Sequence, residues 1–258
     1  MNFPVRVAAL IRGSPFRGRM ASRSRYTSKE LTAATWRDFE AMFSKHNGVW
    51  GGCWCMYGHG RTTFQIRGNA EAHRRAKRAL VRAGTAHGVL VYAEGTPVGW
   101  CQYGPRGELP RIDGGRFYRK LSVPEDERFW RITCFFVGRG RRNRGVASAA
   151  LDGALAAIRK RGGGVVEAYP FTSAASSFAY YGSEAMFRRQ GFELVARLGK
   201  SQVVMRKRVP PKVRHAGARN RTGSSRLTGG GSAVELRPRG AARSLTGITT
   251  SSASRSRT

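Results

Sequence analysis

The stretch Gly138–Ser148, GRGRRNRGVAS, holds residue types that suit the binding of an anion. It follows an apolar run and precedes an Ala-rich segment, so we expect a turn between a buried strand and a helix. The first turn of a helix offers backbone N–H groups without intrahelical partners, at the positive end of the helix dipole. Gly145 and the small Ala147 would let a phosphate approach the backbone, while Arg142 and Arg144 add positive charge. The spacing therefore predicts a phosphate site.

Other interpretations of this stretch fit less well. It lacks the three-glycine fingerprint of dinucleotide-binding folds and the Gly-Lys-Ser/Thr ending of the P-loop. A nucleic-acid site would need interleaved aromatic residues, and Phe135 and Phe136 are expected in a buried strand instead. A solvated basic turn that caps a helix is the alternative without a ligand.

The stretch Arg142–Ala147 resembles the Q/R-x-x-G-x-G/A signature of the GNAT superfamily of acyl-CoA N-acyltransferases. The flanking segments VGWCQYG, CFFV and MFRRQGFELV occur in the order of that family's core, and the resemblance covers residues 86–208, with 26–85 supplying the variable first helices. It implies an α/β (α+β) fold. Its central sheet would be mixed and mostly antiparallel, with splayed fourth and fifth strands and flanking helices.

The resemblance also implies which residues bind the co-substrate acetyl-CoA. Phe136 and Val137, at the end of the splayed strand, would bind the pantetheine arm. A backbone N–H group nearby would stabilise the thioester oxyanion. The pyrophosphate would be bound, mainly through backbone N–H groups, by Arg142, Asn143, Arg144, Gly145, Val146 and Ala147.

The residues for proton transfer depart from the family pattern. Many relatives carry a tyrosine as general acid four residues before the last Gly-Phe pair, where this chain has Phe187. A phenyl ring cannot donate a proton, so the role of the acid is either unfilled, taken by water, or moved to Tyr180 or Tyr181.

The glutamate base of some relatives is also missing, since an ungapped match places Arg131 there. Glu167, Tyr169 and Glu184 remain as alternatives. Tyr169, expected near the cleft, is the first choice.

A second notable stretch is WGGCWCMYGHG, residues 50–60. Cys53 and Cys55, with His46 and His59, have the types of zinc ligands, but their spacing differs from a Cys-x2-Cys knuckle and no metal is predicted. Two interpretations remain open. The loop either packs aromatic rings and thiols against the sheet, or lines the acceptor pocket, as the resemblance implies, with Trp50, Trp54, Tyr57 and His59.

The elements that must position these residues follow from the hydrophobic periodicity. Helices are expected over 35–45, 69–83, 145–161 and 176–191. A hairpin is expected over 88–104, and strands over 129–137, 165–170, 192–199 and 202–209.

The length of 258 residues and the 40% hydrophobic content allow one sizeable domain. Of the net charge of +32, residues 1–25 and 206–258 carry +18, which leaves +14 in the middle and favours anionic ligands. We predict a disordered basic leader over 1–25, a GNAT-like acetyltransferase domain over 26–209 and a disordered Ser/Gly/Arg-rich tail over 210–258.

The four cysteines lie in apolar or aromatic settings, and we recognise no secretory signal and no apolar run near the roughly 20 residues of a membrane span. A cytoplasmic protein without membrane partners is therefore expected. Its first predicted function is N-acetyl transfer from acetyl-CoA to an amine of an unidentified acceptor, by direct transfer. The alternative is a basic nucleic-acid or ribosome-binding protein that keeps the fold with little or no turnover.

Overall fold

The computed structural model of the chain describes residues 25–49, 51–60, 69–123, 127–172 and 179–212. Except for Arg25 and residues 210–212, the predicted leader and tail lie outside these ranges. No helix among the described residues has the length and apolar character needed to cross a membrane.

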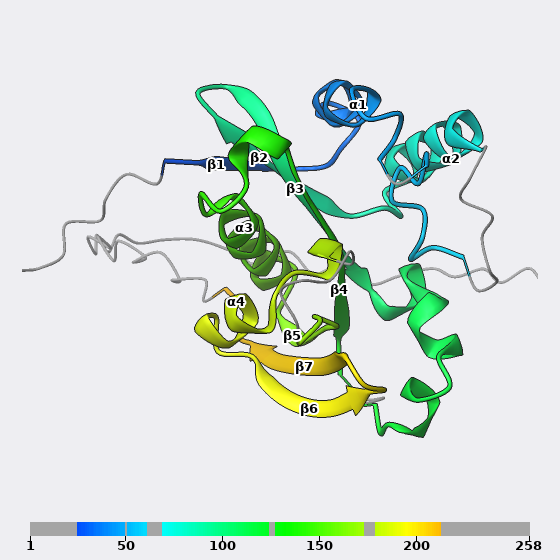
Figure 1. The fold of residues 1–258 in the computed structure, drawn as a ribbon, viewed down its shortest axis with the longest axis vertical. Helices are drawn as coiled ribbons and strands as arrows, with labels where there is room; N and C mark the ends of the chain where they lie inside the picture. Colours follow the sequence, from blue (N-terminus) through cyan, green and yellow to red (C-terminus); the bar gives the residue numbers. More distant parts are fainter. Residues whose placement is uncertain (1–24, 50, 61–68, 124–126, 173–178, 213–258) are drawn as a thin grey trace, which may run out of the picture. The chain divides into compact units, whose positions relative to one another are not determined.

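A seven-stranded sheet forms the centre of the fold, in the order β1-β2-β3-β4-β5-β7-β6 (Figure 1). Neighbouring strands are antiparallel except β4 and β5, which are parallel. The prediction of a mixed, mostly antiparallel sheet is confirmed. Its strands are β1 (Thr27–Glu30), β2 (Gly88–Ala93), β3 (Thr96–Pro105), β4 (Phe129–Val137), β5 (Gly164–Ala168), β6 (Glu193–Leu198) and β7 (Gln202–Val209).

Strands β4 and β5 pair along only part of β4. Their register ends where Ile132 meets Ala168, although β4 continues to Val137 beside β3. The β3 register shifts at this level and leaves Thr133 as an extra residue in β4. Such a bulge bends a strand, so β4 turns away where its pairing with β5 ends. This is the predicted splay of the fourth and fifth strands.

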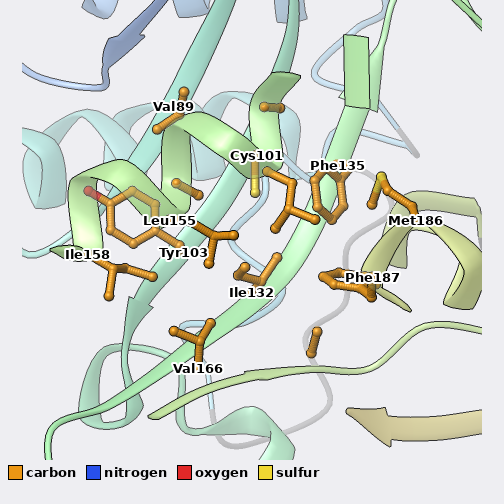
Figure 2. Packing of buried hydrophobic residues seen from close by; sticks show 14 of the residues in the cluster. Val89, Cys101, Tyr103, Ile132, Phe135, Leu155, Ile158, Val166, Met186 and Phe187 are labelled. Atoms are coloured by element: carbon orange, nitrogen blue, oxygen red, sulfur yellow. The ribbon is translucent and has the colours of Figure 1, made fainter. Parts of the chain in front are cut away.

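Helices cover both faces of the sheet. α3 (Val146–Lys160) connects the parallel strands β4 and β5 and packs its apolar stripe on one face, together with α4 (Glu184–Arg189). α1 (Trp36–Ser44) and α2 (Ala70–Arg82) cover the other face. Figure 2 shows the core on the α3 side, in which Phe135, Met186 and Phe187 lie together.

Gly99 of β3 allows α3 to begin close to the sheet. A Cβ atom at this position would lie 2.4 Å from Cγ1 of Val146, the first residue of α3. The glycine thus fixes where the N-terminus of α3 meets β3, beside the end of β4.

Two predicted segments differ from the observed ones. Of the helix expected over 176–191, residues 176–178 lie outside the described ranges, and in the remainder only α4 is α-helical. Gly182 has a φ of +78°, and the Ser183 side chain caps α4 by accepting from the Met186 N–H. Strand β1 was not predicted. Three of its four residues are exposed, so it has no apolar alternation and pairs only along β2.

Short 3-10 helices form the remaining connections. η4 follows β4 in the chain, and η5 contacts β4. The connection from β3 to β4 contains three of these turns, which bring its side chains over the end of the sheet. The five 3-10 helices of the described residues are η1 (Arg106–Glu108), η2 (Pro110–Gly114), η3 (Tyr118–Lys120), η4 (Arg139–Arg141) and η5 (Ala179–Tyr181), and the first three lie between β3 and β4.

Candidate functional site

The loop Gly138–Ser148 joins β4 to α3, as predicted from its sequence. Gly145, the residue before α3, has a φ of +85°, and a Cβ atom there would meet only the Tyr26 ring, at 4.0 Å. The Tyr26 hydroxyl donates to the Arg144 carbonyl at 2.8 Å and holds the loop. Among the described residues, no acceptor is bound by the backbone N–H groups of 143–148. This arrangement leaves open space in front of unpaired donors, which suits a phosphate.

The arginines of this loop have no acidic partners within the described part of the chain. Arg142 and Arg144 are exposed, as is Asn143, which adopts a φ of 57°. Val146 is buried against β3 and Ala147 is half-buried. The loop therefore combines free positive charge with a backbone shaped by αL residues, which is the chemistry that a pyrophosphate needs.

The predicted pantetheine residues lie on the part of β4 beyond its pairing with β5. Phe136 and Val137 pair with Trp100 and Gly99 of β3, so their opposite backbone edge faces the splay. The Phe136 ring packs against Phe43 of α1, with ring centroids 5.4 Å apart. The loop Gly138–Ser148 follows directly after this edge of β4 in the chain.

A cavity of about 380 Å³ lies beside the β3–β4 connection. It is lined by Tyr57 of the α1–α2 connection, Tyr181 of η5 and Gln202 of β7. Most of its wall comes from the β3–β4 connection. The lining residues are Tyr57, Arg111, Ile112, Gly114, Gly115, Arg116, Phe117, Tyr118, Tyr181, Leu198 and Gln202.

Of the four aromatic and histidine residues predicted to bind substrate, the structure describes three and places them apart. Tyr57 lines the cavity. Trp54 is 3% exposed and stacks on Phe43 and Trp36 in the core below α1, which is the packing interpretation of this loop. Trp50 lies outside the described residues.

His59 lies away from this cavity and lines a second one, with His87 and Glu108. Its Nε2 atom is 2.9 Å from Nζ of the fully buried Lys77 and 2.9 Å from Nε2 of Gln102. Burial and, to a smaller extent, Lys77 lower the pKa of His59 to about 2. His59 is therefore neutral and acts as a hydrogen-bond acceptor within the fold.

Tyr180 and Tyr181 are brought to the splay by η5, which contacts β4. Their ring centroids are 4.7 Å apart, and Tyr181 also lines the cavity. Burial raises the pKa of Tyr180, and the nearby Tyr57 phenol and Cys134 thiol raise it further. Both tyrosines therefore stay protonated near neutral pH.

Tyr169 is fully buried and its hydroxyl donates to Glu167 Oε1 at 2.6 Å. The Tyr118 hydroxyl donates to the same oxygen at 2.6 Å, and Arg206 Nε donates to Oε2 at 2.6 Å. Burial raises the pKa of Tyr169, and the Glu167 carboxylate raises it further. Tyr169 thus belongs to a buried polar network, which we call the Glu167 network, while Tyr118 connects this network to the cavity.

Arg131, at the position of the missing glutamate base, extends the Glu167 network. It donates to the Tyr118 hydroxyl at 3.1 Å and forms two hydrogen bonds to the Asp113 carboxylate, at 2.6 and 2.9 Å. Asp113 also binds Arg106. A guanidinium held in this way cannot accept a proton, so Arg131 has a positioning role only.

Phe187, at the position of the family's acid, is completely buried in the α3-side core. Its ring packs edge-on against Phe135 and Phe192, with centroids 6.0 and 5.0 Å away. Figure 2 shows Phe187 beside Phe135. Glu184 is bound to Arg188 on the same short helix.

The cysteines are free thiols. Burial raises the pKa of Cys55, and its neighbours Cys134 and Cys53 raise it further. In the described ranges no three His, Cys, Asp or Glu side chains are grouped closely enough to hold a metal ion. His46 instead packs on the Phe136 ring, with centroids 5.3 Å apart.

A mixed sheet whose parallel strands β4 and β5 separate, with helices on both faces and a glycine-bearing turn between β4 and α3, has the architecture of a GNAT-type acetyltransferase fold. The sequence matches the acetyltransferase (GNAT) family over residues 34–192. This chain therefore belongs to the GNAT acetyltransferase family, and the predicted family is confirmed. No curated protein matches the chain by sequence.

Three of the solved structures to which the chain is similar are described as acetyltransferases. One is the histone acetyltransferase HPA2 and related acetyltransferase from Corynebacterium glutamicum, at 16% identity and a TM-score of 0.45, covering 74% of this chain and 98% of that one. A ribosomal-protein-alanine N-acetyltransferase from Brucella melitensis has 18% identity and a TM-score of 0.41, covering 70% and 99%. An N-acetyltransferase from Staphylococcus aureus has 10% identity and a TM-score of 0.43, covering 71% and 98%. At these scores the likenesses carry no argument about substrates.

Sequence reasoning missed the contribution of the β3–β4 connection. Arg111, Arg116 and Tyr118 from this connection form much of the cavity wall, and Asp113 anchors it to Arg131. The signal available in the sequence was a Gly-Gly-Arg-Phe-Tyr segment between two strands, which is compatible with an ordinary surface loop.

Proposed function

We propose that this protein is an N-acetyltransferase that moves the acetyl group of acetyl-CoA directly to an amine. The observation that carries the proposal is the loop Gly138–Ser148 at the end of the splayed strand. Among the described residues, the N–H groups of 143–148 have no acceptor and the arginines of the loop have no acidic partner. Membership of the GNAT family supports the same reaction class. The basic middle of the chain is then explained in part by the phosphates of the co-substrate.

The residues of this chain would divide the work of binding between two segments. The backbone of Asn143–Ala147 would bind the pyrophosphate, with Arg142 and Arg144 adding charge. The free edge of β4 at Phe136 and Val137 would bind the pantetheine arm, which orients the thioester towards the cavity. The acceptor amine would enter from the cavity at Tyr57 and Tyr181.

The reaction forms a C–N bond and breaks the C–S bond of the thioester. The amine must lose a proton, and the departing thiolate must gain one. We assign the second proton to the Tyr180 hydroxyl, because Tyr180 belongs to η5, which contacts the splayed strand β4, and because its phenol stays protonated. Tyr169 is less suitable, since its hydroxyl already donates to Glu167.

Binding and turnover can be tested separately with the full chain. Isothermal titration should detect acetyl-CoA, and S-acetylpantetheine, which lacks the pyrophosphate, should bind at least about tenfold more weakly. Absence of binding at millimolar acetyl-CoA would overturn the proposal. A panel of amines should then release free thiol from acetyl-CoA, whereas salt-sensitive RNA binding that persists with saturating acetyl-CoA, without thiol release, would favour the nucleic-acid alternative.

The role of Tyr180 is tested with Tyr180→Phe. We expect kcat to fall by about 10²–10³-fold, with little change in acetyl-CoA affinity, and the alkaline limb of the pH profile to change. Tyr181→Phe is the matched control, because it removes the adjacent hydroxyl. Equal rates for Tyr180→Phe and the parent protein would exclude Tyr180 as the acid.

A further inference from the structure

We infer that Cys55 and Cys134 form an oxidation site, at which a peroxide converts the two thiols into a disulfide. The disulfide would slow acetyl transfer, because it joins the segment that carries Tyr57 to the splayed strand β4. The oxidation itself is independent of the proposed function, whereas its effect on turnover rests on that function. The inference follows from the position of the two cysteines, from the exposure of the thiols and from a buried amine beside them.

Cys55 and Cys134 approach each other from segments that lie far apart in the chain. Cys134 belongs to β4 and is the partner of Gln102 on β3. Side chains of directly opposed residues point to the same face of a sheet, and the Gln102 amide donates to the Cys55 carbonyl at 3.1 Å. Cys55 therefore lies over the Gln102–Cys134 pair, where both cysteines pack in the core below α1 and their thiols interact.

The four thiols differ in their access to an oxidant. Cys134 is partly exposed, whereas the other three are buried. An oxidant therefore meets Cys134 first. Cys101 lies in the core on the α3 side of the sheet, and the Cys53 thiol donates to the Gly48 carbonyl at 3.6 Å. Cys55 is thus the thiol that is placed to react with an oxidised Cys134.

A buried lysine beside the thiols supports the reaction, which needs thiolates. Lys77 of α2 is fully buried, with its Nζ atom 2.9 Å from His59 Nε2. Burial lowers the pKa of Lys77, and its strongest electrostatic interaction is with Cys55. As an ammonium group Lys77 stabilises a nearby thiolate, and as an amine it can accept the proton of the thiol.

The reaction consumes one peroxide for two thiols. The Cys134 thiolate attacks an oxygen of hydrogen peroxide, so that an S–O bond forms, the O–O bond breaks and hydroxide leaves. The Cys55 thiolate then attacks the sulfur of this sulfenic acid, so that an S–S bond forms, the S–O bond breaks and a second hydroxide leaves. The two thiol protons convert both hydroxides to water. The sulfurs lose two electrons, which the peroxide gains.

The disulfide would act on the proposed site through the segments that it joins. Tyr57, which lines the cavity, follows Cys55 by two residues. Strand β4 carries Cys134 and contacts η5, which contains Tyr180. An S–S bond of about 2.05 Å draws the two segments together. The cavity wall and the proposed acid would then be displaced from the positions that transfer requires.

Thiol counting and peptide mapping of the full chain test the oxidation site. After reduction and removal of the reductant, hydrogen peroxide should consume two of the four thiols. A disulfide should then join the tryptic peptides 46–61 and 132–139. Cys134→Ala and Cys55→Ala should lose this link. Cys101→Ala is the matched control, because it removes a buried thiol on the α3 side, and it should keep the link.

Cys53 also neighbours Cys55, so Cys53→Ala decides which thiol of peptide 46–61 reacts. This variant should keep the link to peptide 132–139. A disulfide between Cys53 and Cys55, four thiols that stay reduced, or an unchanged link in Cys55→Ala would overturn the inference. If Cys55→Ala does not fold, Cys134→Ala gives the same decision at a partly exposed position.

The effect on turnover is measured as the initial rate of acetyl transfer after removal of the peroxide. Oxidation should lower kcat about tenfold or more, and a dithiol reductant should restore it. Cys134→Ala should respond to neither treatment. An unchanged rate in the disulfide-linked protein would refute the effect on turnover. If the reduced protein transfers no acetyl group, the proposed function fails, while peptide mapping still decides the oxidation site.

Discussion

The loop Gly138–Ser148 and the Glu167 network are both rich in arginine, yet their arginines have opposite surroundings. Those of the loop, such as Arg142 and Arg144, are exposed and have no acidic partners among the described residues. Arg131 and Arg206 of the network are buried or nearly so and each binds a carboxylate at 2.6 Å. Whether an arginine binds a carboxylate of the protein therefore distinguishes the structural arginines of the network from the loop arginines, which we propose to bind a ligand.

This difference follows from desolvation. A buried guanidinium without a carboxylate would cost several kcal/mol, so each network arginine depends on its acid and the acid on its arginine. An exposed guanidinium keeps its water and can exchange it for a phosphate. We expect substitutions in the network to change stability and substitutions in the loop to change acetyl-CoA affinity.

The largest effect is expected for Glu167→Leu. It leaves Arg206, Tyr118 and Tyr169 without their common acceptor, and the free energy of unfolding should fall by about 3–5 kcal/mol. Urea denaturation measures this, and the milder Glu167→Gln should show a smaller loss in the same direction if the leucine variant does not fold.

The matched loop variant is Arg142→Met. It removes a guanidinium without an ion-pair partner, so its free energy of unfolding should change by less than about 0.5 kcal/mol. Similar losses in Glu167→Leu and Arg142→Met would abolish the distinction between the two regions.

The second effect concerns the loop alone. Gly145→Trp should weaken acetyl-CoA binding at least about 100-fold, because the side chain would fill the space in front of the N–H groups. Isothermal titration measures the affinity. Gly84→Trp is the control, since Gly84 also has a positive φ, of +71°, and open surroundings but lies at the end of α2. The two variants should lose similar stability, and unchanged affinity in Gly145→Trp would disprove the phosphate assignment.

The smallest effect concerns pH. Burial acts to raise the pKa of Asp113, but Arg131 and Arg106 outweigh it and hold that pKa below the usual 3.8. As the pH falls, the unfolded chain binds this proton first, so the stabilisation is complete above the usual pKa and is lost as the pH falls through the folded-state pKa.

Between about pH 6 and about pH 3, the free energy of unfolding of the parent protein should therefore fall more than that of Asp113→Asn, as measured by urea unfolding. The difference should be less than about 1 kcal/mol, because the carboxylate is one-third exposed. Arg142→Met should follow the parent curve. An identical pH dependence in Asp113→Asn would mean that this ion pair does not stabilise the network.

The sequence predicted the parts of this molecule that depend on local patterns. Strand β4 begins and ends at the expected residues, and α3 begins within one residue of the expected position, because each has a strong apolar period. The position of the loop Gly138–Ser148 between β4 and α3 was predictable for the same reason, while its binding of a phosphate stays a prediction.

The cavity and the Glu167 network could not be predicted, because their members are distant in the chain. Tyr57 and Arg111 stack across 54 positions, and Tyr118 and Glu167 bind across 49. The polar residues of η2 and η3 carry no periodic signal that would separate them from a solvated loop. Tyr169 was expected to face the cleft, and only the positions of Glu167 and Tyr118 show where its hydroxyl is directed.

The extra residue Thr133 reverses the alternation of side chains along β4, so the set that faces α3 changes at this point. Before it, Trp130 and Ile132 contact the α3-side core, whereas after it Phe135 and Val137 do so, and Cys134 and Phe136 face α1. Even-numbered residues thus face α3 in the first half of the strand and odd-numbered ones in the second. A deletion of one residue here would turn the Cys134 thiol towards α3 and the Phe135 ring towards α1, so the length of this strand determines which of its side chains face each layer of helices.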